Sequence, residues 1–176
     1  MNGRLERVRP LLRTRQCRHF TDEPVDEADL RALTEVARWT GSSRNSQPWL
    51  FLVTRDVDLI RALGELGHPQ TRALHLASAA IAIVMPQDET RTATYAYDEG
   101  RVAERILVAA GMLGLGAGIC WVRSDVRQRA AELLALPADR FVRTVMAVGL
   151  ASAEGAAPKS ASGQARLPHD ELVLTK

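Results

Sequence analysis

The spacing of apolar residues predicts helices alternating with short buried strands. After Asp26, whose side chain can cap a helix, an apolar stripe recurs at helical intervals: Leu30, Leu33, Val36 and Ala37. Continuous apolar runs such as "AAIAIVMP" (79–86) are instead typical of buried strands. On these criteria we expect helices over 3–13, 26–39, 57–66 and 98–114 and one beginning at about Ser124, and strands over 49–54, 79–86, 117–122 and 142–151.

This alternation alone favours a doubly wound parallel sheet, but the usual marker of that fold is missing. No G-x-G-x-x-G or P-loop follows any predicted strand. The run "GLGAG" (114–118) precedes a strand instead of opening a helix, so we interpret it as a tight helix-to-strand turn. The pattern of elements therefore leaves the fold class open.

Composition indicates a globular protein of single-domain size, over residues 1–176, with 46% apolar and 25% charged residues. The net charge is only +2 (23 basic minus 21 acidic residues), which argues against nucleic acid or an anionic membrane as the partner. No apolar stretch approaches the roughly 18 residues of a membrane span. The arginine-rich N-terminus has no apolar signal region, and Cys17 and Cys120 have no metal-like spacing, so we expect reduced thiols in a cytoplasmic protein.

Candidate chemistry is sparse among the side chains. The four histidines are scattered, without metal-ligand spacing, and no nucleophile–base pair is evident. Asp98 and Glu99 could form a catalytic carboxylate pair, but at the start of a predicted helix they are better explained by the helix dipole. We therefore expect a cofactor to supply any reaction.

The arginines near the two chain ends suggest what that cofactor contains. Arg13, Arg15 and Arg18 lie near the N-terminus and Arg166 near the C-terminus. Each alone would be ordinary surface, but arginine is suited to bidentate phosphate contacts. A phosphate held from both ends of the chain is a reasonable hypothesis. The polar stretch "GSSRNSQPW" (41–49), directly before a predicted buried strand, is typical of a binding lip.

Four segments in order resemble motifs of the FMN-dependent nitroreductase family. They are "RTRQCRHFTDEPV" (13–25), "GSSRNSQPW" (41–49), "DEGRVAERILVAAGMLGLGAG" (98–118) and "ARLPHDELV" (165–173). The resemblance spans nearly the whole chain. It implies an α+β fold with a mixed, largely antiparallel central sheet wrapped by helices, in a homodimer with FMN at the subunit interface.

The resemblance also implies roles for individual residues. Around the FMN phosphate and ribityl chain we expect Thr14, Arg15 and Gln16, with Arg166 completing the phosphate clamp. Arg18 is expected beside the N1/O2 edge of the flavin ring. Gln70 is expected to face the pyrimidine edge, and backbone N–H groups at Cys120 and Trp121 to face N5 and O4. A last set is expected to reach across the interface to the partner's FMN: Ser42, Ser43 and Asn45.

The function implied by the resemblance is ping-pong transfer of reducing equivalents from NAD(P)H through FMN to a small acceptor such as a nitroaromatic or quinone. Two alternatives stay open. One is a flavin-binding carrier or redox sensor without turnover. The other is a specialised member of the dimethylbenzimidazole synthase or reductive dehalogenase type.

Overall fold

The computed structural model describes residues 3–157 and 166–175. The strands are β1 Leu50–Thr54, β2 Ala79–Pro86, β3 Gly116–Trp121 and β4 Arg140–Gly149. The helices are α1 Gly3–Arg7, α2 Arg9–Arg13, α3 Glu27–Arg38, α4 Val57–Leu66, α5 Thr92–Met112, α6 Arg127–Leu133, α7 Ala153–Ala156 and α8 His169–Leu172. Among the described residues, no helix is both long and apolar enough to cross a membrane.

The four strands form one sheet in the order β1-β2-β4-β3, and every neighbouring pair is antiparallel. The parallel sheet suggested by helix–strand alternation is therefore wrong: strands β2 and β3 run in the same direction, but β4 lies between them and is antiparallel to both. The α+β fold with a largely antiparallel sheet, expected from the family resemblance, is confirmed. A register shift between Ile83 and Val84 marks a bulge where β2 pairs with β4.

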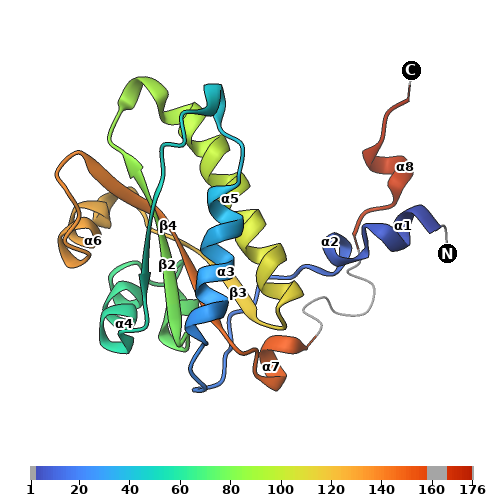
Figure 1. The fold of residues 1–176 in the computed structure, drawn as a ribbon, viewed down its shortest axis with the longest axis horizontal. Coiled ribbons are helices and arrows are strands. Elements are labelled where there is room, and N and C mark those ends of the chain that lie inside the picture. The colour runs from blue at the N-terminus through green and yellow to red at the C-terminus, as the bar shows by residue number, and fades with distance from the viewer. Residues whose placement is uncertain (1–2, 158–165, 176) are drawn as a thin grey trace.

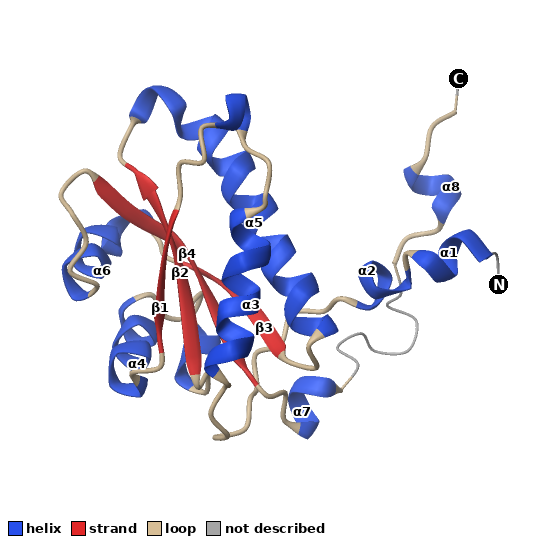
Figure 2. Ribbon diagram, in the orientation of Figure 1, coloured by secondary structure: helices blue, strands red, loops and turns tan. Residues whose placement is uncertain are grey.

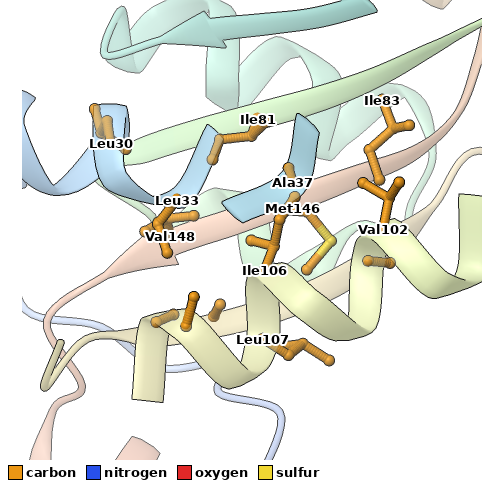
Figure 3. Close-up of a cluster of buried hydrophobic side chains, with 14 of the residues drawn as sticks. Leu30, Leu33, Ala37, Ile81, Ile83, Val102, Ile106, Leu107, Met146 and Val148 are labelled. Carbon is orange, nitrogen blue, oxygen red and sulfur yellow. The ribbon is translucent and has the colours of Figure 1, made fainter. Parts of the chain in front are cut away.

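Helices cover both faces of the sheet, with α3 and α5 on one side and α4 and α6 on the other (Figures 1 and 2). Side chains of β2 alternate between the two resulting cores, Ile81 facing α3 and α5 and Ala80 facing the opposite layer. Figure 3 shows Leu33, Ile106 and Met146 meeting in the first core. Burying both faces of β2 explains why its sequence is continuously apolar.

Helix α3 follows the sequence prediction closely. Asp26 caps it by accepting a hydrogen bond from the backbone N–H of Ala28 (3.0 Å). Leu30, Leu33 and Ala37 are buried, whereas Val36 lies at the margin of the stripe and is exposed.

Helix α5 begins earlier than the sequence pattern predicted. It starts at Thr92, following a short turn in which Asp88 accepts from the N–H of Thr90 (2.9 Å). Asp98 and Glu99 consequently lie within the helix, where both are buried. Their assignment to the helix dipole at an N-terminus is wrong, since they face the protein interior and bind groups there.

The interpretation of "GLGAG" as a helix-to-strand turn holds for Gly114, whereas Gly116 and Gly118 lie within β3. Gly114 has φ +77° and donates to the carbonyl of Gly111 (3.3 Å), while Leu115 donates to that of Ala110 (2.8 Å). This left-handed helix end is a conformation that glycine adopts without strain. At the next predicted helix, Ser124 instead begins a 3-10 turn (Ser124–Val126), and α6 follows at Arg127.

Both ends of the chain project to one side of the sheet and its helices (Figure 1). The predicted helix over 3–13 is divided at Val8 into α1 and α2. Its apolar stripe is solvent-exposed in the isolated chain, with relative exposures of 41–58% at Leu5, Val8, Leu11 and Leu12. Such a stripe has no covering surface within the described part of one chain.

Candidate functional site

The first motif lies along the open edge of β3. Cys17 N–H donates to the carbonyl of Ala117 (2.7 Å), and Thr21 N–H donates to that of Leu150 (2.9 Å) just past β4. Phe20 and Ala151 form an antiparallel bridge between the same segments. Residues 14–21 are thereby fixed against the sheet.

Two glycines of β3 permit this close approach. A Cβ atom added at Gly118 would overlap the carbonyl oxygen of Cys17, and one at Gly116 would lie 2.8 Å from the Cβ of Cys17. Strand β3 therefore needs residues without a side chain at the two positions where Cys17 packs against it.

Gly118→Ala is expected to lower the free energy of unfolding by about 1–3 kcal/mol, because the first motif must move away from β3. Gly100→Ala provides the control, since its added Cβ meets nothing within 4 Å inside α5. That variant should gain about 0.5–1 kcal/mol of helix stability. Urea unfolding measures both, and equal effects at the two positions would contradict the close approach.

A cavity of about 1340 Å³ opens beside this segment. Its walls come from α2, the C-terminal part of α5, the start of β3, and α7. Of the predicted phosphate contacts, Thr14, Arg15 and Arg166 line it. The structure therefore brings residues from both chain ends to one place, as the arginine hypothesis required.

The cavity is rich in positive charge. Arg9 and Arg13 also line it, and Arg9 is paired with Glu6 (2.6 Å). Arg15 donates from Nη1 to the carbonyls of Leu12 and Thr14 (both 2.8 Å), which holds its guanidinium close to α2. Within the described ranges 3–157 and 166–175, Arg13 and Arg166 form no ion pair, so their charges are available to an anion.

Gln16 and Arg18 lie outside that cavity wall, nearer to the middle of β3. The side-chain oxygen of Gln16 accepts from the N–H of Ile119 (3.3 Å) and from Nη2 of Arg18 (3.5 Å). This places Arg18 apart from Arg15 and Arg166, in line with separate expected roles at the ring and at the phosphate.

Backbone N–H groups along β3 point alternately toward β4 and toward the open edge of the sheet. Val122 N–H donates to Arg143 in the β4 direction (2.8 Å), whereas Ile119 N–H points outward to Gln16. The same alternation turns the N–H of Cys120 toward β4 and that of Trp121 toward the open edge. Ile119 and Trp121 are thus the edge donors, and Ile119 was not singled out from the sequence.

The side chain of Cys120 belongs to the core on the α4 and α6 side. Burial raises the pKa of its thiol to about 11, so the thiol stays protonated at neutral pH. Trp121 is half exposed at the end of β3.

Gln70 lies in the exposed turn that follows α4, where its N–H donates to the carbonyl of Gly67 (3.2 Å). Arg123, two residues after Trp121, donates to the carbonyl of His68 (2.9 Å). This hydrogen bond holds the Gln70 turn beside the exit of β3.

The second-motif loop (residues 40–49) is held in an unusual conformation. Arg44, Asn45 and Gln47 have φ of 54°, 53° and 44°, in the left-handed region that disfavours residues with a Cβ. The buried carboxylate of Asp98 accepts from the N–H of Ser43 (3.1 and 3.2 Å), and Ser42 Oγ accepts from the N–H of Gln47 (2.8 Å). These contacts fix the loop and leave Asn45 exposed.

One chain does not bring this loop to the arginine-lined cavity. The loop is anchored at Asp98, whereas Leu107, Gly111 and Met112 line the cavity nine to fourteen residues further along α5. At 1.5 Å rise per residue, Asp98 lies about 14 Å from the nearest of these residues along the helix axis and about 21 Å from the farthest. Ser42, Ser43 and Asn45 therefore belong to a loop held at the N-terminal half of α5, whereas Thr14, Arg15 and Arg166 line a cavity at its C-terminal half.

Comparison with known proteins agrees with this architecture. Residues 11–74 match the model of the nitroreductase family. These residues include both the first and the second motif. The resemblance to the nitroreductase family is confirmed. A relative from Archaeoglobus fulgidus, provisionally named an NADH dehydrogenase/NAD(P)H nitroreductase, is 29% identical over 77% of this chain and 79% of its own length.

Solved structures share the nitroreductase fold. An FMN-dependent nitroreductase from Clostridium difficile aligns with a TM-score of 0.80 at 22% identity, over 94% of this chain and 96% of the other. A nitroreductase family protein from Streptococcus pneumoniae gives 0.78 at 23% identity, over 94% and 98%. The described residues contain no group of three or more histidine, cysteine or acidic side chains able to hold a metal ion.

Proposed function

We propose that the protein is an FMN-dependent oxidoreductase that passes reducing equivalents from NAD(P)H to a small acceptor such as a nitroaromatic or quinone. The observation that supports this most is the cavity where Thr14, Arg15 and Arg166 meet beside the open edge of β3. The names of the Archaeoglobus and Clostridium proteins point in the same direction.

The residues around the cavity fit the parts of FMN. Arg15 and Arg166 would hold the phosphate, with Thr14 as a further hydrogen-bonding group. Gln16, Arg18 and the outward N–H of Trp121 at the β3 edge would contact the ring, and Gln70 lies at the exit of the same strand. No dinucleotide fingerprint is present for a second phosphate, which favours FMN over FAD.

When bound, FMN would supply the redox chemistry, which is hydride transfer from a nicotinamide to the flavin and from the flavin to a second substrate. The chain contributes position and charge. Arg18 places a cation near the ring, and the β3 edge offers donors held rigidly by the sheet. The described residues therefore orient the reaction without acting as nucleophile or base.

We further propose a homodimer in which Ser42, Ser43 and Asn45 contact the partner's FMN. The loop's anchor at Asp98 is about 14 Å or more along α5 from the residues that line its own chain's cavity, which supports a contact to the partner's FMN instead. The exposed stripe on α1 and α2 offers an apolar surface for the second subunit to bury.

Sedimentation equilibrium should give a dimer at micromolar concentration. Leu11→Glu, on the exposed stripe, should shift the protein toward monomer and release FMN. Val57→Glu introduces the same charge at an exposed position of α4, on the other side of the sheet, and should remain dimeric. A monomer that retains FMN would contradict the shared site.

Steady-state oxidation of NADH and NADPH with a nitroaromatic acceptor tests the proposed activity. Parallel double-reciprocal lines are expected, because a single site serves both substrates in turn. A protein that binds FMN but shows no turnover with nitroaromatics or quinones would instead support the carrier or sensor alternative.

A further inference from the structure

A second cavity, of about 310 Å³, lies at the opposite end of α5. It is bounded by the turn after β2, the first turns of α5, helix α6 and the start of β4. It shares no lining residue with the first cavity. Figure 1 shows α6 and α2 on opposite sides of the molecule.

Three arginines line this cavity, and two of them lie over one aromatic ring. The guanidinium carbons of Arg127 and Arg143 lie 5.7 and 5.8 Å from the ring centre of Phe141. Arg140 also lines the cavity and donates from Nη1 to the carbonyl of Pro48 (2.9 Å). The ring and these hydrogen bonds hold the guanidiniums in place before any ligand arrives.

The three arginines of the cavity differ in how closely acidic side chains neutralise them. Arg143 is paired with the buried carboxylate of Glu99, its Nε 2.9 Å from Oε2. Arg140 has a long contact to Asp139 (3.9 Å) at the surface and no closer acidic partner among the described residues. Arg127 donates from Nε to the carbonyl of Val122 (3.2 Å) and has no ion-pair partner in the described part of the chain.

Two effects lower the pKa of Arg127: its own partial burial, and the positive charge of the neighbouring Arg143. The negative charge of Glu99 raises the pKa again, but only in part. A half-buried cation beside another cation is unfavourable unless an anion joins it. Arg127 lines a cavity large enough for such an anion.

Two acidic residues also belong to the cavity wall. Asp88 is engaged with Thr90, accepting from its N–H (2.9 Å) and its hydroxyl (2.6 Å). Glu89 lies in the adjoining exposed turn. Two carboxylates therefore share the cavity wall with the three arginines, which favours a small anion over a long polyanion.

We propose that this cavity binds a small oxyanion, a phosphate or carboxylate group of a small metabolite, on Arg127, Arg140 and Arg143. Planar guanidiniums match such groups with paired hydrogen bonds. The volume suits a ligand at the small end of the usual range for protein pockets. Within one chain the site shares no lining residue with the proposed phosphate site, and the proposal does not depend on flavin chemistry.

Isothermal titration of the FMN-loaded protein tests the proposal with inorganic phosphate and with malonate, at constant ionic strength set by chloride. Saturable binding of at least one probe is expected. Arg127→Gln should weaken it about 10- to 100-fold, the loss expected for one charge-assisted contact. Arg127→Lys, which keeps the charge but not the planar fork, should also weaken it.

Arg129→Gln is the matched control, because it removes the same charge from an exposed position on α6 outside the cavity. It should bind the probes as the unaltered protein does. Arg140→Gln provides a second test if Arg127→Gln fails to retain FMN and its fold. No saturable binding of either probe, or equal weakening in Arg129→Gln and the cavity variants, would overturn the proposal.

Discussion

Glu99→Ala is expected to lower the free energy of unfolding by about 3–5 kcal/mol, the cost of leaving one partner of a buried ion pair alone. Glu99 is 2% exposed and accepts from both Nε and Nη2 of Arg143, whose side chain is only 16% exposed. Without the carboxylate, a buried guanidinium loses its counter-charge and two hydrogen bonds.

Glu99→Gln should cost less, because it keeps an oxygen that can accept from Arg143. Glu104→Ala is the matched control, since it removes an exposed carboxylate from the same helix. Its effect should stay within about 0.5 kcal/mol. Urea unfolding of all three variants in the same cofactor state measures the difference. A loss below about 1 kcal/mol for Glu99→Ala would contradict the importance of this pair.

Arg166→Ala is expected to weaken FMN binding by about 10- to 100-fold while leaving the flavin midpoint potential nearly unchanged. Arg166 lines the cavity together with Arg13 and Arg15. A charge-assisted contact from a guanidinium to a phosphate is strong enough that the loss of one should be measurable even with these neighbours present.

Arg18→Ala should have the opposite profile. Arg18 is held at Gln16, beside the β3 edge and outside the cavity wall. Its loss should lower the midpoint potential, because a nearby cation favours the reduced, anionic ring. Arg7→Ala, an exposed position on α1 outside the cavity, should change neither quantity. If Arg166→Ala shifts the potential and Arg18→Ala changes only affinity, the roles assigned to the two residues are reversed.

Local elements were predictable where the apolar pattern was unambiguous. The strand expected over 79–86 coincides with β2, because both of its faces are buried and its sequence is uniformly apolar. The start of α5 was missed because residues 92–97 mix threonine, alanine and tyrosine without a clear stripe. Strand order and direction could not be predicted from the apolar pattern. The pattern shows which face of a strand is buried, but not which other strand it pairs with.

The candidate site was likewise predictable only in part. Arg15 and Arg166 lie far apart in sequence, and the family resemblance anticipated that they would meet. The outward N–H of Ile119 was missed because it depends on β3 being an edge strand. The role of Asp98 in holding the N–H of Ser43 was hidden by the misplaced helix start.

The most direct test of the central claim is the identity of the flavin released by heating the purified protein. Chromatography should show FMN, equimolar with the chain, and the protein should be yellow before heating. Release of FAD, or a colourless protein that cannot be reconstituted with FMN, would contradict the account.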